Sequence, residues 1–242
     1  MNNIFKNVLK IIGFFIIGMV GGIFANQIFW PYFIERSLFY QYRLEQRPIY
    51  LTERKEIFIQ ENVALENAIE RVERSVIGIR TKTAAGRILE GSGLIVTSDG
   101  LVITLAELVP AGSSFSFFIE GKPVNFQILR RDIKNNLALI KLTDLQNLPT
   151  VRFEQFENIK LGKRVFLIGA IFNREEVKKV VNEGIITSFD ENLIKTNILE
   201  KNILSSSLLF NVQGSFLGIN IIDKEGRVST IPISKIRTFT GL

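Results

Sequence analysis

Residues 91–104 read GSGLIVTSDGLVIT, and this stretch sets the structural class of the chain. Asp99-Gly100 lies between two apolar runs, which is a strong signal for a tight β-hairpin. The runs are rich in Ile, Val and Leu, and β-branched residues pack well in pleated strands. The stretch therefore predicts two antiparallel strands joined by a short turn.

The same pattern continues along the chain to its C-terminal region. Further short apolar runs separated by turn residues occupy 75–80, 114–119, 124–129, 137–142, 164–169, 183–189, 193–198, 207–211, 216–222 and 227–233. Helical periodicity returns only at 233–239. This many short strands with almost no helix predict an all-β barrel or a pair of sandwiches.

The N-terminal region is apolar. Residues 11–25 carry no charge, Lys6 and Lys10 precede them, and Trp30 and Tyr32 follow them. A helix over about residues 8–30 would span a hydrocarbon layer of roughly 30 Å, with the aromatic pair at the interface. A secretory signal peptide is the alternative, but no A-x-A site ends the run. We expect an uncleaved anchor over 1–34.

The chain between the anchor and the strands changes character twice. Residues 35–58 mix charges with apolar residues and predict a stalk. Residues 59–75 place apolar side chains three and four apart, which predicts a helix with one apolar face. The barrel domain is expected over 76–242. Charges on both sides of the anchor do not decide its orientation.

The composition excludes several kinds of chemistry. The sequence has no His and no Cys, so zinc sites of the His or Cys type, disulfides and an imidazole base are all impossible. No cofactor is expected. The net charge is +6, but the 30 Lys and Arg residues are scattered without a long basic block, so nucleic-acid binding is not expected.

The order of segments resembles the protease domain of the HtrA family of trypsin-like serine proteases. The resemblance covers residues 62–238 and rests on SVIGIRTK, GSGLIVTSDGLVIT, RRDIKNNLALIKL, LGKRVFLIG, NEGIITS, LIKTN and LLFNVQGSFLGIN in register. It implies a trypsin-like fold of two six-stranded β-barrels, with the active site in the cleft between them. It also implies trimers and an extracytoplasmic barrel domain. Family members usually carry a PDZ domain after the protease, and none is expected before Leu242.

The family's catalytic positions carry other residues in this sequence. Glu107 stands at the histidine position, Asn136 at the aspartate position and Ser205 at the position of the nucleophile. Ile203 replaces the glycine of the oxyanion hole, and the two glycines after the nucleophile are replaced by Ser206 and Ser207. A serine hydroxyl is a weak nucleophile without a base, and loss of one triad partner commonly costs on the order of 10⁴ to 10⁶ in turnover.

The sequence therefore predicts a membrane-anchored protease homologue that is proteolytically inactive and binds peptides or proteins. One alternative is a residual serine endopeptidase in which Lys201 or Glu107 acts as the base for Ser205. Another is a structural subunit of a mixed oligomer with active family members. Residues that serve turns and close strand packing are kept, namely Gly91, Gly93, Asp99, Gly100, Gly214, Gly218 and Asn220, so the barrels are expected to form.

Overall fold

The computed structural model describes residues 2–28, 63–173, 176–200 and 205–242. The chain divides into two units, Met1–Ile59 and Gln60–Leu242. The first unit contains α1 (Asn2–Phe24). Phe5–Ile28, with a mean hydropathy of 2.3, is long and apolar enough to cross a membrane, and a signal sequence would pass the same test. The predicted stalk and the last residues of the predicted anchor lie outside the described residues.

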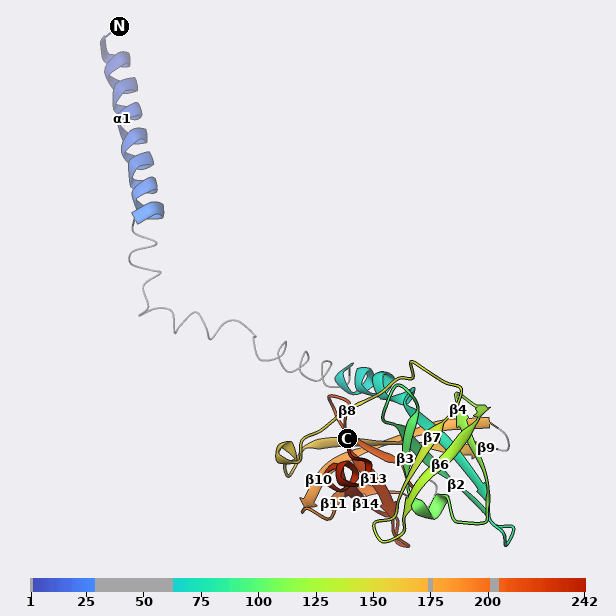
Figure 1. Cartoon of the computed structure of the whole chain (residues 1–242). Coiled ribbons are helices and arrows are strands. Elements are labelled where there is room, and N and C mark those ends of the chain that lie inside the picture. Colours follow the sequence, from blue (N-terminus) through green and yellow to red (C-terminus); the bar gives the residue numbers. More distant parts are fainter. Residues whose placement is uncertain (1, 29–62, 174–175, 201–204) are drawn as a thin grey trace. The chain divides into compact units, whose positions relative to one another are not determined.

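The second unit opens with helical residues 63–73, drawn in teal in Figure 1, where the sequence predicts a helix. Ala68 and Val72 of this 63–73 helix are buried in the core, with Leu65 and Ile69 packed against it. Two seven-stranded sheets follow (Figure 1). They confirm the predicted all-β, trypsin-like double barrel.

The first sheet has the strand order β5-β4-β1-β2-β3-β7-β6. Its strands are β1 (Val76–Lys82), β2 (Ile88–Ile95), β3 (Leu101–Thr104), β4 (Ser114–Ile119), β5 (Lys122–Val124), β6 (Phe126–Asp132) and β7 (Leu137–Leu142). β2 pairs antiparallel with β3 and Gly100 has φ +96°, so the predicted Asp-Gly hairpin is confirmed. The Phe126 ring contacts Phe115 and Phe117, which brings β6 against β4 through side chains.

The second sheet has the order β12-β9-β10-β11-β14-β13-β8, and pairing of β12 with β13 closes it. Its strands are β8 (Arg152–Phe153), β9 (Arg164–Asn173), β10 (Glu176–Phe189), β11 (Ile194–Leu199), β12 (Leu208–Asn211), β13 (Ser215–Ile222) and β14 (Arg227–Pro232). Helix α4 (Ile233–Thr240) follows. The resemblance predicts six strands in each barrel, whereas each sheet has seven. The additional strands are short: β5 has three residues and β8 has two.

Three apolar clusters form the core of the domain, and one of them joins the two barrels. One fills the first barrel around Phe117 and Ile140, and a second fills the other barrel around Leu167 and Leu209. The third joins side chains from both barrels, α4 and the 63–73 helix, and includes Phe210. Because the third cluster lies between the barrels, loops from both are fixed relative to each other. This arrangement positions the site described below.

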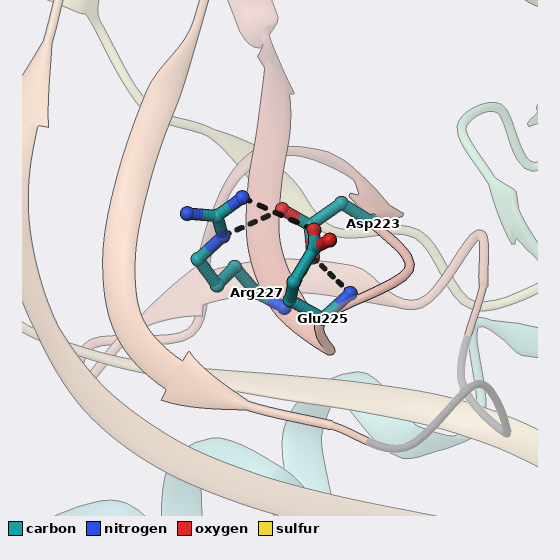
Figure 2. A network of polar contacts seen from close by, with 3 residues as sticks. All are labelled: Asp223, Glu225 and Arg227. Carbon is teal, nitrogen blue, oxygen red and sulfur yellow. Dashed lines mark hydrogen bonds and ion pairs between the residues drawn. The ribbon is translucent and has the colours of Figure 1, made fainter.

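The hairpin between β13 and β14 is held by charged side chains (Figure 2). Arg227 pairs with Asp223 at 2.7 Å and with Glu225 at 3.1 Å. The backbone N–H of Arg227, then its guanidinium, lowers the pKa of Asp223. The carbonyl of Gly226 in this turn accepts a hydrogen bond from the N–H of Glu200, at 2.7 Å. The hairpin therefore fixes the chain just before the serine loop of the candidate site.

Candidate active site

The three triad-equivalent residues come together from three separate elements. Glu107 lies on the short 3-10 helix η2 (Ala106–Leu108), Asn136 on the turn between β6 and β7, and Ser205 just before β12. The Ser205 hydroxyl donates a hydrogen bond to Glu107 Oε1, at 3.1 Å. The two residues are 98 positions apart in the sequence, so only the fold brings them into contact.

Asn136 orients the glutamate from the other side. Its Oδ1 accepts a hydrogen bond from the N–H of Glu107 at 3.0 Å, and its Nδ2 donates to Glu107 Oε2 at 3.4 Å. The carbonyl of Asn136 also accepts from the N–H of Ala106, at 3.2 Å. Asn136 has φ +52°, a left-handed conformation that asparagine tolerates better than most residues. The result is a linear chain of contacts from Asn136 through Glu107 to Ser205.

Ser206, the next residue, is fully buried and links the two barrels. Its Oγ accepts a hydrogen bond from the N–H of Ser92 on β2, at 2.7 Å. The Ser92 hydroxyl in turn accepts from the N–H of Ala170 on β9, at 2.7 Å. Buried N–H groups without an acceptor cost about 1–3 kcal/mol, so this relay satisfies two of them. The role of Ser206 is structural.

Ser206 also retains a backbone conformation that favours glycine, with φ +64°. Replacement of the family's glycine has therefore not prevented the left-handed turn at this position. The buried hydrogen bond from the Ser92 N–H offsets the steric cost of this conformation, which is about 1–2 kcal/mol for an L-residue. Gly91 leaves the space for this serine, because a Cβ on Gly91 would lie 2.4 Å from Ser206 Oγ.

Ser207 has a second structural role. Its Oγ accepts a hydrogen bond from Nδ2 of Asn220 at 2.9 Å, and Asn220 Oδ1 accepts from the hydroxyl of Thr230 at 2.6 Å. All three residues are fully buried. Of the three consecutive serines, only Ser205 directs its hydroxyl to a triad-equivalent residue. Ile203 and Lys201, predicted as the oxyanion position and as an alternative base, lie outside the described residues.

The chemistry of this arrangement differs from that of a Ser-His-Asp triad. A carboxylate accepts the proton of a serine hydroxyl far less readily than imidazole, because an ordinary glutamate has a pKa of about 4.3. A carboxylate beside Ser205 Oγ also supplies no hydrogen-bond donor for the negative charge that develops during acyl transfer, which peptidases stabilise with such donors. The exposed side of Glu107 remains in contact with water.

Comparison with known proteins places the chain in a family. A family model described as a trypsin-like peptidase domain matches residues 91–219, which include Glu107, Asn136 and Ser205. The chain belongs to the trypsin-like peptidase family. This trypsin-like peptidase domain has a TM-score of 0.65 and 23% identity to the solved structure of an AlgW variant, an HtrA-type protease, with a tripeptide. That match covers 73% of this chain and 62% of the other, and it supports the trypsin-like fold.

Curated relatives of this trypsin-like peptidase domain are HtrA and DegP-like proteins, which confirms the resemblance to the HtrA family. A probable periplasmic serine endoprotease DegP-like from Halomonas elongata is 30% identical over 139 residues, or 54% of this chain and 28% of the relative. Serine protease HTRA1 from Xenopus tropicalis is 29% identical over 163 residues, or 62% of this chain and 35% of the relative. The chain thus aligns with about a third of the length of these relatives.

Sequence reasoning missed the residues that support the site. Ser92, Asn220 and Thr230 carry its buried hydrogen bonds, yet only Asn220 was singled out from the sequence, as a packing position. The sequence does contain a signal that identifies two of these residues. Ser92 and Thr230 are polar residues inside apolar strands, and such residues are buried only with partners.

Proposed function

We propose that this trypsin-like domain is a proteolytically inactive member of its family that binds extended peptide segments. The observation that carries the proposal is the hydrogen bond from Ser205 Oγ to Glu107 Oε1, in a chain that contains no histidine. Among the described residues, the Ser205 hydroxyl has a carboxylate as its partner, and the chain has no imidazole, the general base that a Ser-His-Asp triad uses for acyl transfer.

An edge of β13 near Ser205, on which no described strand pairs beyond the β12 register, supports peptide binding. Asn220 on β13 uses its C=O to accept from Ser206 N–H and its N–H to donate to Ser207 C=O, on the side that faces β12. Backbone groups alternate sides along an antiparallel strand, so the N–H and C=O of Ile222 point to that same side. Among the described residues no strand pairs there, since the register of β12 on β13 ends at Ile219.

An extended peptide can add to such an edge through main-chain hydrogen bonds, which need no triad. The site would then keep the recognition step of a peptidase without its reaction. The N-terminal helix α1 would anchor this domain to a membrane. We place the domain on the extracytoplasmic side, because curated relatives are named as periplasmic. Assembly into trimers, as the family resemblance implies, stays a prediction, and a mixed oligomer with active family members stays an alternative.

The experiment tests reaction and binding separately on the full chain in neutral detergent. Fluorescent unfolded casein should bind the protein and remain uncleaved over many hours. Ile222→Pro removes the edge N–H and should weaken casein binding about tenfold or more, whereas Ile222→Val keeps the backbone donor and should bind normally. Cleavage that disappears in Ser205→Ala would contradict inactivity, and equal binding by both Ile222 variants would contradict the edge site.

Residual hydrolysis is the second candidate function, and the same Ser205–Glu107 contact favours it. Glu107 Oε1 lies at 3.1 Å from Ser205 Oγ, within the distance expected between a base and its nucleophile. A serine-directed fluorophosphonate probe distinguishes the two functions. Labelling of Ser205 that is lost in Glu107→Gln would support a Ser-Glu pair. Absence of labelling in the wild type would exclude it and leave the binding function.

A further inference from the structure

A concave site lies on the side of the domain formed by the 63–73 helix. It has a volume of about 570 Å³ and lies between this helix, the segment 150–152 that leads into β8, and the turn 212–214 between β12 and β13. None of its lining residues is Glu107, Asn136 or Ser205. We call it the helix pocket, and it is separate in composition from the candidate active site.

The polar lining of the helix pocket consists of hydrogen-bond donors and positive charge. Arg71 and Arg152 both line it, together with the amides of Asn67 and Gln213 and the hydroxyl of Thr150. No Asp or Glu is among the lining residues. Arginine presents five N–H donors in a rigid fork that matches carboxylate and phosphate oxygens. Two formal positive charges therefore face one cavity without a lining carboxylate.

Neither arginine is neutralised within the described part of the chain. The ion pairs found there involve other cations, including Arg74 in the turn directly after the helix, which pairs with Glu120 at 3.4 Å. The nearest acidic residue in sequence to Arg152 is Glu154, and its carboxylate accepts hydrogen bonds from the side chains of Asn158 and Asn211. Arg71 and Arg152 thus retain their donors for a ligand.

The walls of the helix pocket are rigid. Asn211 Oδ1 accepts hydrogen bonds from the N–H groups of Gln213 and Ser215, both at 2.9 Å, which closes the turn. Gly214 in this turn has φ +78°, and a Cβ there would lie 3.3 Å from Val72 of the helix. Arg152 is held by the parallel pairing of β8 with β13. Both arginines therefore extend from fixed backbone, which lowers the entropy lost on binding.

We infer that the helix pocket binds a phosphate group. A phosphate carries a charge of about −1.5 to −2 at neutral pH and three strong acceptor oxygens, which match two guanidinium groups and several neutral donors. A carboxylate offers a single charge to the same two cations. The phosphate can belong to a soluble ion or to the headgroup of a lipid, and the same chemistry recognises both. This inference does not depend on the function proposed for Ser205.

The test uses the full chain in neutral maltoside detergent, titrated by calorimetry with inorganic phosphate and, separately, with glycerophosphoglycerol, a soluble phospholipid headgroup. Saturable binding of either probe is expected, and it should weaken about tenfold or more in Arg71→Gln and in Arg152→Gln. Arg74→Gln is the matched control, since Arg74 lies in the turn directly after the same helix and outside the pocket, and it should bind as the wild type does.

The outcomes separate the sources and decide the inference. Binding of inorganic phosphate indicates a soluble ligand, and binding of the headgroup alone indicates a lipid. No saturable binding of either probe overturns the inference, as does equal weakening by Arg74→Gln and the two pocket variants. Circular dichroism of each variant checks the fold, and the Arg→Gln changes are made at exposed positions, which rarely affect folding.

Discussion

Ser206 and Ser92 join the two barrels through a buried hydrogen bond in which the Ser206 hydroxyl accepts from the Ser92 backbone N–H at 2.7 Å. The two residues lie 114 positions apart, one beside the candidate nucleophile and the other on β2. This contact explains why a serine occupies a left-handed position next to Ser205. It also gives the sharpest stability prediction.

We expect Ser206→Ala to lower the free energy of unfolding by about 1–3 kcal/mol, because the buried N–H of Ser92 loses its acceptor while the left-handed strain remains. Ser206→Gly loses the same acceptor but relieves the strain, so it should be about 1 kcal/mol less destabilising than Ser206→Ala. Urea denaturation of both variants measures the difference. Equal stability of wild type and Ser206→Ala would show that the bond contributes nothing.

Gly91→Ala tests the space around the same serine. The added Cβ would lie 2.4 Å from Ser206 Oγ and 2.6 Å from Leu108 Cδ1, both inside van der Waals contact. Overpacking of this kind costs about 1–3 kcal/mol. Gly86→Ala provides a control for loss of a glycine, since no atom lies within 4 Å of its Cβ position, although its φ of +80° adds strain. Thermal denaturation should give Gly91→Ala a lower melting temperature than the Gly86→Ala control.

The site itself can be tested by restoring a base. Glu107→His combined with Asn136→Asp puts an imidazole between a carboxylate and Ser205, and a positioned general base typically contributes 10² to 10⁴ in rate. We expect fluorophosphonate labelling of Ser205 to rise at least tenfold above wild type. Glu107→Gln, which keeps the size but removes the basic oxygen, should show no rise. Failure of the double variant would mean that the surrounding backbone no longer supports the reaction.

The Asp223 hairpin predicts a dependence of stability on pH. The backbone N–H and guanidinium of Arg227 lower the pKa of Asp223 in the folded protein. A carboxyl with a depressed folded pKa stabilises fully above its unfolded value of about 3.9, and this stabilisation is lost as the pH falls through the folded pKa.

Asp223→Asn should therefore be less stable than wild type at pH 7, and the difference in melting temperature should shrink below about pH 4. Lys224→Gln changes an exposed residue of the same turn, and its difference in melting temperature from wild type should not depend on pH in this way. If the difference in melting temperature between Asp223→Asn and wild type stayed constant down to pH 2, the lowered pKa of Asp223 would be contradicted.

Much of the fold could be predicted from local sequence. Asp99-Gly100 marks a hairpin because glycine accepts the positive φ that the turn requires, and the structure confirms it. β8 was missed because two residues, Arg152 and Phe153, carry no periodicity, and their pairing with β13 is parallel and distant in sequence. β10 begins at Glu176 rather than near residue 183, because charged residues around Lys178 mask its alternation.

The candidate site could be predicted in part. Matching to family positions selected Glu107, Asn136 and Ser205, and the structure brings these three side chains together. The function of Ser206 could not be predicted, since its partner is a backbone N–H on another barrel. A backbone donor leaves no trace in residue identity, so no pattern in the sequence reveals such a contact.

Because the donor at position 92 belongs to the main chain, no side-chain replacement there except proline can remove it. The side chain at position 206 must therefore supply the acceptor for this N–H, and it must also be small enough to fit against Gly91. Position 206 should consequently tolerate far fewer substitutions than position 205. A saturation library selected for folding alone should retain serine at position 206 and accept many different residues at position 205.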